Sequence, residues 1–345
     1  MKERERSFLQ NGSILLENLI SSCNGIYNPI RNFSIEEINI DTNNFDRCHI
    51  IQKYSLFLER GFRVDEVELY GEDDNYAFYV LYRGCLDDRP IIVKKFKGLV
   101  GEDELRSLAI RDMVITTQMS KHKNVLKLLG YCLEFPVPVL FLENAKNGAL
   151  NDQGGFGANE YLPWMIRVQV AKELANALTY LHTALSRPII HRDIRDPTVF
   201  SWTMTLFLNL ATSHLPSQIT IPPDQSHSID TVKGDLWHLD PTYRYSRSVT
   251  QKSNVYSFGV FLLVLLAGER PMYDTIEKYE RHPVLNDKLT EIVDPKLSSE
   301  GGEDGKAQQI GSFLKLASAC SQKKSEARPD MIDVAKELMQ IEKSL

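Results

Sequence analysis

Apolar residues recur at helical spacing in several separate stretches of this chain. The clearest lie at residues 164–184, 307–320 and 331–341. Positions three and four residues apart share one side of a helix, so each stretch predicts a helix with a buried face. A fourth stretch, at 255–266, is almost wholly apolar and indicates a helix buried on all sides. In the first stretch the apolar positions are Val168, Ala171, Leu174, Ala175, Leu178 and Leu181.

The first 45 residues predict a helical extension. Ser13 is a candidate N-cap and Gly25 a candidate stop for a first helix, and residues 34–37 have capping-box spacing for a second. The extension either packs on the following domain or docks a partner, because its apolar face has to be covered. The apolar residues of the first helix are Leu15, Leu16, Leu19 and Ile20.

Composition narrows the class of protein. A chain of 345 residues with 43% apolar content predicts about two domains or lobes. A net charge of −6, with both signs interspersed, gives no electrostatic footprint for nucleic acid. Five cysteines without metal-ligand spacing indicate a reducing compartment and predict no metal site.

Neither a targeting segment nor a membrane span is expected. The N-terminal Met-Lys-Glu-Arg-Glu-Arg lacks the apolar core of a signal peptide, and Lys2 excludes N-myristoylation, which needs glycine at that position. The longest apolar run, at 258–267, has half the roughly 20 residues that span a bilayer. We therefore expect a soluble, cytoplasmic protein with no transmembrane segment.

Six motifs in a fixed order carry a family resemblance. They are Ile91-Ile92-Val93-Lys94, Leu128 to Glu134, Ile189 to Phe200, Gly234 to Tyr243, Asn254 to Gly259 and Arg328-Pro329. This succession resembles the landmarks of protein kinases from about residue 45 onward. It implies an α+β, two-lobed protein kinase-like fold over 46–345, with an N-lobe at about 46–143 and a C-lobe at about 144–345. Residues 1–45 precede it as the helical extension.

The stretch that resembles the kinase catalytic loop keeps the Asp that acts as the base and lacks a metal ligand. His191, Arg192 and Asp193 match the kinase triplet whose Asp accepts the proton of the substrate hydroxyl. The Lys expected two residues later is Arg195, which is cationic but planar and bulkier. Kinases next place an Asn whose amide oxygen ligates magnesium. Thr198 stands there, with a shorter and poorer ligand.

The second metal position is also substituted. The triplet Asn209-Leu210-Ala211 stands where kinases carry Asp-Phe-Gly, and no Asp occurs between Pro197 and Pro223. A slip in the alignment cannot therefore restore the missing carboxylate. Because phosphoryl transfer depends on positioning and charge neutralisation by metal ions, the chain is predicted to be catalytically dead or severely impaired.

The nucleotide-binding parts are vestigial. Gly61 and Gly71 stand far apart where a Gly-rich loop is expected, and residues 66–74 are acidic, which is typical of a solvated surface loop. Lys94 is retained, and Asp112 is the candidate partner on a helix at about 105–119. Asp is a methylene shorter than the usual Glu, which argues against the ion pair. Lys94 either contacts ATP or serves packing alone, so no cofactor is predicted and ATP binding stays open.

Two anchors of the large lobe are changed as well. Thr242 replaces the Glu that pairs with a C-lobe Arg, so Arg328 is expected to lack its usual ion partner. Asn254 replaces an Asp that supports the catalytic loop, which keeps the shape and removes the charge.

The segment at 212–231 stands where a kinase activation loop would be. Its composition, with three prolines and few apolar anchors, predicts mobility in the isolated protein. It is either a relic or a regulatory segment that orders on a partner or is modified at its hydroxyls. Those hydroxyls belong to Thr212, Ser213, Ser217, Thr220, Ser226, Ser228 and Thr231.

A narrower resemblance rests mainly on the N-terminal residues. Residues 8–13, 23–25, 29–31, 33–34 and 133–136 are similar to signatures of the plant ZED-related receptor-like cytoplasmic pseudokinases. That resemblance implies an adaptor of innate immunity, cytoplasmic or held at the plasma membrane through partners.

The implied partners are a coiled-coil NLR immune receptor, bound through its leucine-rich repeats, and related active receptor-like cytoplasmic kinases. The implied signal is the action of bacterial effectors on those kinases or on the adaptor itself. Two alternatives remain, an ATP-binding nucleotide sensor and a weakly active atypical Ser/Thr kinase.

Overall fold

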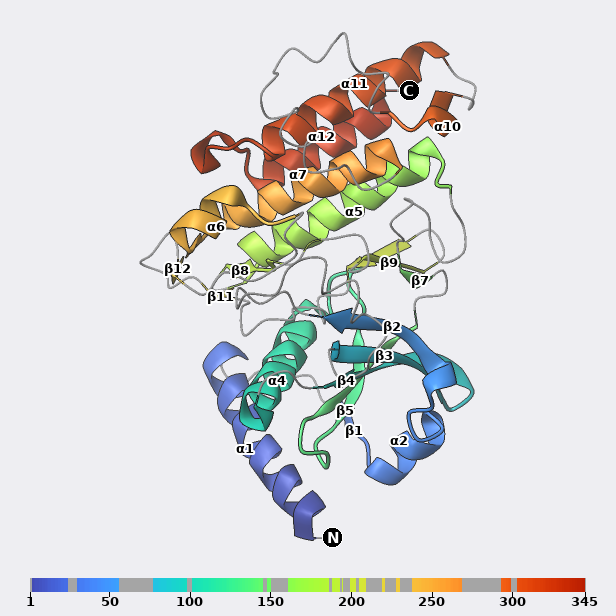
Figure 1. Cartoon of the computed structure of the whole chain (residues 1–345), viewed down its shortest axis with the longest axis vertical. Coiled ribbons are helices and arrows are strands. Elements are labelled where there is room, and N and C mark those ends of the chain that lie inside the picture. Colours follow the sequence, from blue (N-terminus) through green and yellow to red (C-terminus); the bar gives the residue numbers. More distant parts are fainter. Residues whose placement is uncertain are drawn as a thin grey trace. The chain divides into compact units, whose positions relative to one another are not determined.

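The computed structural model divides into two compact units, which are described separately (Figure 1). The first unit comprises residues 1–145 and 209–216, and the second comprises residues 146–208 and 217–345. The structure describes residues 2–23, 30–55, 77–97, 101–144, 148–149, 161–185, 188–192, 194, 199–202, 205–208, 219–220, 228–229, 238–268, 293–298 and 303–344.

The first unit is built on a six-stranded sheet with the order β1-β5-β6-β4-β3-β2. Its strands are β1 (Arg31–Asn32), β2 (Ile50–Ser55), β3 (Ala77–Leu86), β4 (Arg89–Phe96), β5 (Leu128–Cys132) and β6 (Val139–Glu143). All neighbours are antiparallel except β1 and β5, which are parallel. Asp87 and Asp88 both have positive φ in the two-residue turn between β3 and β4, as the twist of a tight hairpin requires.

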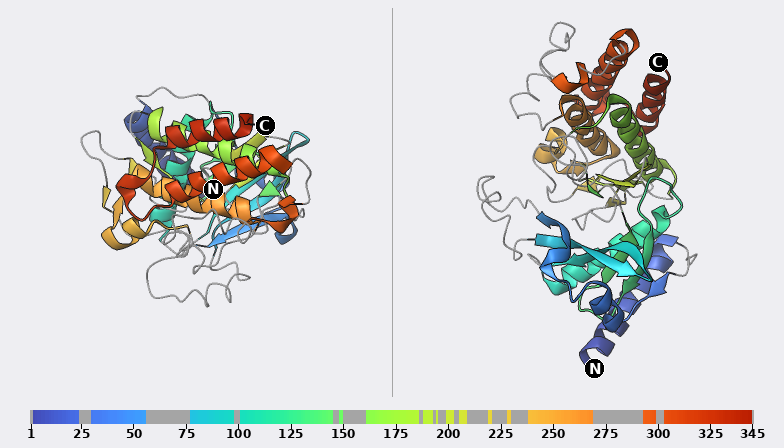
Figure 2. Two further views of the ribbon diagram at one scale, coloured as in Figure 1. Left: turned by 90° about the horizontal axis from the view of Figure 1, so that it is seen from above. Right: turned by 90° about the vertical axis from the view of Figure 1, so that its right-hand side faces the viewer.

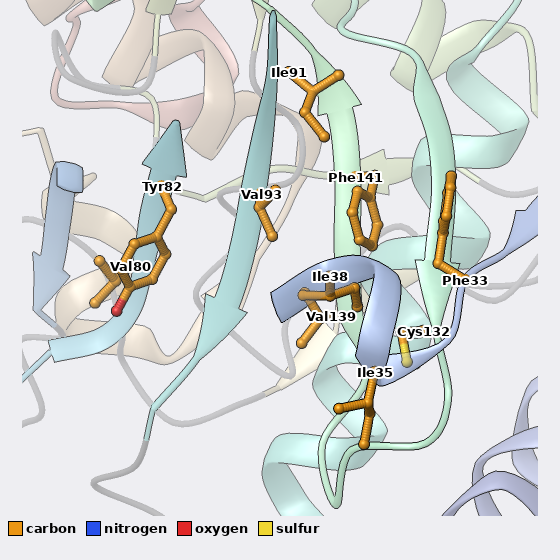
Figure 3. Packing of buried hydrophobic residues seen from close by; sticks show 10 residues of the cluster. All are labelled: Phe33, Ile35, Ile38, Val80, Tyr82, Ile91, Val93, Cys132, Val139 and Phe141. Atoms are coloured by element: carbon orange, nitrogen blue, oxygen red, sulfur yellow. The ribbon is translucent and has the colours of Figure 1, made fainter. Parts of the chain in front are cut away.

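Two helices cover opposite faces of this sheet. Figure 3 shows α2 (Ile35–Asp41) directing Ile35 and Ile38 onto one face, where they meet a cluster that includes Phe33 and Phe141. The other face carries Lys94, which contacts α4 (Glu102–Met119). Successive strand residues point to opposite faces, so Val93 faces α2 while Lys94 faces α4. The helix predicted at about 105–119 is thus confirmed, and it begins one turn earlier.

The N-terminal extension is an integral part of the first unit. Helix α1 (Lys2–Cys23) packs on α4 and buries Leu15 and Leu19. The Asn11 amide donates to the carbonyl oxygens of Leu133 and Phe135, at 2.7 and 2.9 Å. Ser13 is therefore not the N-cap as predicted, because the helix starts eleven residues earlier. The candidate stop Gly25 lies outside the described residues.

The second helix of the extension starts where the sequence predicts. The capping box of α2 forms: Ser34 accepts from the Glu37 amide, and the Glu37 carboxylate accepts from the Ser34 amide at 2.8 Å. The strand that precedes it, β1, lies against β5 with Arg31 beside Gly130. Phe33 follows β1 and is buried, so this part of the extension completes the sheet and its core.

The second unit is mainly helical. Its long helices are α5 (Trp164–Thr183), α7 (Gln251–Ala267), α11 (Glu303–Cys320) and α12 (Met331–Lys343). In the views of Figures 1 and 2 they run side by side, and α7 contacts both α5 and α11. Residues 253–266 of α7 are all buried, as its apolar sequence predicts. The four helices predicted from periodicity are confirmed, with ends that differ by at most four residues.

Short elements complete this unit. They are β7 (Gly148–Ala149), β8 (Ile189–Ile190), β9 (Val199–Trp202), β10 (Thr205–Leu208), β11 (Ile219–Thr220), β12 (Ser228–Ile229), β13 (Ser248–Val249), α6 (Pro241–Ser246) and α10 (Pro295–Ser298). A short helix η5 (Ser325–Ala327) precedes Arg328, as η1 (Arg47–His49) precedes β2 in the first unit. The strand β8 forms the start of the catalytic-loop motif, and β13 comes directly before α7. Among the helices that the structure describes, none has the length and apolar character to cross a bilayer.

Candidate functional site

The retained lysine of the first unit forms a buried ion pair. Lys94 Nζ donates to Asp112 Oδ2 at 2.8 Å, and the two residues are 0% and 1% exposed. Asp112 is thus the partner of Lys94, as the sequence suggested, and the argument against the pair from its shorter side chain is wrong. The backbone of α4 lies near enough to β4 for the shorter carboxylate to reach. Thr116 donates to the other carboxylate oxygen at 3.3 Å, which fixes the Asp112 side chain further.

Two aromatic rings lie close to the Lys94 ammonium. Lys94 Nζ lies 4.0 Å from the ring centroid of Tyr79 and 4.8 Å from that of Phe96. Ring faces carry negative charge density and attract a desolvated cation. Burial raises the pKa of Asp112, and the Lys94 ammonium opposes that shift. The two charges therefore lie in buried, low-dielectric surroundings, where each depends on the other.

In the second unit, Arg192 is held by both its backbone and its side chain. Its φ is +66°, in the left-handed region that side-chain-bearing residues seldom adopt. The Arg192 amide donates to Asn254 Oδ1 at 3.0 Å, and a guanidinium nitrogen donates to the Tyr243 hydroxyl at 2.8 Å. The strained turn is thus fixed by residues from α7 and α6.

Asn254 also contacts a buried histidine. Its Nδ2 lies 2.9 Å from Nε2 of His182, at the end of α5. An amide nitrogen can only donate, so Nε2 accepts and the imidazole is neutral. Burial lowers the pKa of His182 to about 4, in agreement with that tautomer. Asn254 therefore bridges the catalytic-loop backbone and a neutral ring, which a carboxylate could not do without protonating the histidine.

The large-lobe arginine keeps an ion partner. Arg328 Nη2 donates to Asp240 Oδ1 at 2.7 Å, and both side chains are buried. Thr242 Oγ1, at the position of the missing Glu, is 3.5 Å from the same nitrogen. Arg328 thus lacks its usual ion partner at residue 242, but it is not left without a counter-charge, because a carboxylate two residues earlier supplies it. Arg328 also donates to the carbonyl oxygens of Gln322 and Lys252, at 2.7 and 3.0 Å.

The predicted site residues fall into two groups. His191 and Arg192 are described and buried, at the junction of β8 with the loop. The base position Asp193, the cation Arg195 and the two metal positions Thr198 and Asn209 lie outside the described residues. No group of His, Cys, Asp or Glu suited to a metal occurs among the residues that the structure describes.

The predicted regulatory hydroxyls are mostly outside the described residues too. Thr220 lies in β11, which pairs with β8, and Ser228 lies in β12, which pairs with β13. The predicted mobility of the segment remains a prediction. The other positions, Thr212, Ser213, Ser217, Ser226 and Thr231, are not described.

Sequence reasoning missed several residues of the site, among them Tyr79, His182, Asp240 and Tyr243. Tyr243 and Asp240 flank the substituted position 242, and His182 ends a helix that the sequence did predict. Position in a motif could have suggested Asp240 and Tyr243, and the predicted helix could have suggested His182. Tyr79 carries no such signal, because its role follows from the pairing of β3 with β4.

Comparisons with known proteins agree with this arrangement. Residues 80–341 match the family described as protein kinase domain. The chain is similar to the "Serine/threonine-protein kinase ZRK1" of Arabidopsis thaliana, 38% identical over 100% of this chain and 95% of that protein. It is 36% identical to the "Non-functional pseudokinase ZED1" of the same plant, over 99% of this chain and 98% of the other. The "Non-functional pseudokinase ZRK2" is 35% identical, over 99% and 91%.

Proposed function

The chain belongs to the protein kinase family, within the group that contains ZED1 and its ZRK relatives, and from this premise we propose that it acts as a pseudokinase adaptor. The observation that carries the proposal is the pair of substituted metal positions, Thr198 and Asn209. Kinases hold their magnesium ions through an Asn and an Asp at these positions. The Thr198 hydroxyl does not reach as far as the Asn amide oxygen, and the neutral Asn209 amide lacks the charge of the Asp carboxylate.

The described residues support a scaffold role. Arg328 and Lys94 each keep a buried carboxylate partner, while the partners themselves are changed from the kinase pattern. Removing one member of a buried pair is strongly destabilising, so a fold under selection for shape retains or rebuilds such pairs. Metal ligands serve catalysis and can be lost at little cost to the fold. Retained structural pairs together with lost metal ligands favour a protein that functions by binding partners at its surface.

A kinase assay tests the proposal directly. Purified protein with labelled ATP and magnesium or manganese is expected to show neither autophosphorylation nor transfer to generic substrates. Asn209→Asp alone is expected to leave it inactive, because Thr198 and the missing Gly-rich loop remain. Incorporation that Asp193→Ala abolishes would support the second candidate, a weakly active Ser/Thr kinase. The name of the relative ZRK1 as a kinase is what favours that candidate.

As an adaptor, the protein is proposed to act in plant immunity. We assign it a coiled-coil NLR receptor, contacted through the leucine-rich repeats, and related active receptor-like cytoplasmic kinases. It would report bacterial effector modification of those kinases or of itself, in the cytoplasm or at the plasma membrane through its partners. The resemblance to ZED-related pseudokinases supports this assignment.

Capture from leaf extract tests the partners. Tagged wild-type protein is expected to retain an NLR receptor before infection and to gain an active kinase when an effector is present. A matched control is Gly311→Ala, a change on α11 where an added Cβ has no neighbour within 4 Å. Recovery of no NLR receptor by either protein would contradict the adaptor assignment and leave the pseudokinase assignment untouched.

A further inference from the structure

The ammonium of Lys94 already has partners from its own chain on several sides. Asp112 accepts a hydrogen bond from it at 2.8 Å, and the ring centroids of Tyr79 and Phe96 lie 4.0 and 4.8 Å away. Lys94 is 0% exposed. In kinases the matching lysine pairs with the phosphates of ATP as well as with its carboxylate partner. Here ring faces stand beside a cation that a phosphate would need to reach.

Strand register explains how Tyr79 comes to this place. Leu81 of β3 lies opposite Lys94 of β4, and Tyr79 lies opposite Phe96. Residues two apart on a strand share a face, so Tyr79 and Lys94 point to the same side of the sheet. Tyr79 is the third residue of β3, which begins where the phosphate-binding hairpin should end. Kinases use glycines in that hairpin because side chains would keep the backbone away from the phosphates.

We propose that Tyr79 is an internal plug, a side chain that takes the place of nucleotide phosphates beside Lys94 and so excludes ATP from this protein. Lys94 is then a structural cation that holds α4 on the sheet through Asp112. For a triphosphate to bind, the buried ring would have to leave its cation and its packing. A desolvated cation–ring contact is favourable, and moving a buried tyrosine also loses its packing.

A pseudokinase adaptor can bind nucleotide or exclude it, and the metal positions do not decide which. The sequence left open whether Lys94 contacts ATP or serves packing alone. A ring in the place of the phosphates favours packing, because a nucleotide sensor needs Lys94 to be accessible. The test of the plug therefore does not depend on whether an immune receptor is bound.

The test compares two alanine variants of one strand. Tyr79→Ala and Tyr82→Ala each remove a buried tyrosine ring from β3, but Tyr82 is on the opposite face, in the cluster with Ile35 and Ile38 (Figure 3). Binding of a fluorescent ATP analogue is measured with and without magnesium, and circular dichroism checks the fold. Wild type and Tyr82→Ala are expected to show no saturable binding up to the highest concentration tested. Tyr79→Ala is expected to bind saturably, with a dissociation constant at least about tenfold below that concentration. A folded Tyr79→Ala variant that fails to bind overturns the proposal.

A second measurement does not use Tyr79→Ala, so it holds even if that variant does not fold. An acyl phosphate of ATP acylates a lysine that lies beside bound triphosphate. Peptide mass spectrometry is expected to find Lys94 unmodified in native protein, and unmodified again in Tyr79→Phe, which keeps the ring. Acylation of Lys94 in wild type that excess ATP prevents would overturn the plug.

Discussion

Asp240 provides the carboxylate that Arg328 binds, at 2.7 Å, although the kinase pattern places that carboxylate at residue 242. Both residues are buried, and Thr242 remains within 3.5 Å of the same guanidinium nitrogen. A carboxylate at either residue 240 or residue 242 is thus near enough to pair with Arg328. Asp240 also accepts from the Thr242 amide at 2.9 Å as the N-cap of α6, so one side chain serves two roles.

The first prediction concerns moving the carboxylate partner of Arg328 from residue 240 to residue 242. Asp240→Asn leaves the Arg328 guanidinium buried without its counter-charge and is expected to lower the free energy of unfolding by about 3 kcal/mol. Adding Thr242→Glu in the same chain should restore most of that loss, because a carboxylate then returns to the same nitrogen. Urea unfolding of the wild type and of both variants measures this. A double variant no more stable than Asp240→Asn would show that position 242 cannot reach Arg328.

The second prediction concerns acid. The pKa of His182 is lowered by burial from 6.5 to about 4, so the unfolded chain takes up a proton in that range while the folded chain does not. Stability is therefore present above about pH 6.5 and falls as the pH drops toward 4, by up to about 3 kcal/mol. Urea unfolding at a series of pH values measures the slope.

Variants isolate the contribution of His182. The pKa of His122 is lowered too, by burial and by Lys123, so the wild-type slope includes both groups. His182→Gln keeps an acceptor for Asn254 and cannot titrate, so its slope should be shallower. Asn254→Asp places a carboxylate beside Nε2 and favours the imidazolium, so it too should lose acid sensitivity. An unchanged slope in both variants would contradict the neutral His182 pairing.

Much of the fold could be predicted from the sequence because its helices are long and periodic. α7 is continuously apolar, and the Ser34–Glu37 capping box is a local signal that needs no tertiary context. The start of α1 could not be predicted in this way. Its first residues are polar and exposed, and Asn11 is buried only because it donates to carbonyl oxygens more than a hundred residues away.

The sequence predicted which residues form the site better than it predicted which of them form ion pairs. Lys94 and Asp112 were paired as candidates, but whether an Asp could reach depended on the distance from α4 to β4, which sequence does not contain. The same holds for Arg328, whose choice between residues 240 and 242 is made by the turn into α6. Side chains that fill a space, such as Tyr79, are set by strand register and stay invisible in a motif.

The third prediction tests the docking of the extension onto the sheet. A Cβ built on Gly130 would lie 2.1 Å from a ring carbon of Phe33 and 2.7 Å from the Arg31 carbonyl oxygen. Gly130→Ala must therefore push β1 and Phe33 away, at an expected cost of about 2 kcal/mol. Gly311→Ala is the matched control, because its Cβ has open space within a helix and should stabilise by about 0.5–1 kcal/mol. Thermal unfolding that shows equal effects would mean that β1 is not held at Gly130.

The last prediction concerns the hydroxyls of residues 212–231, and it rests on the proposed adaptor function. Two short strands of this segment, β11 and β12, pair with β8 and β13, and the segment as a whole has few apolar anchors. Order that is gained only against a partner weakens binding but makes it switchable. Replacing Thr212, Ser213, Ser217, Thr220, Ser226, Ser228 and Thr231 with Ala removes every hydroxyl that could be modified there. We expect folding and resting receptor binding to persist, because these depend on the two units, whereas recruitment that requires an effector should be lost. A leaf cell-death assay measures the second property, and co-purification from uninfected tissue measures the first. Normal cell death with the alanine variant would identify the segment as a relic and place the sensing surface elsewhere in the protein.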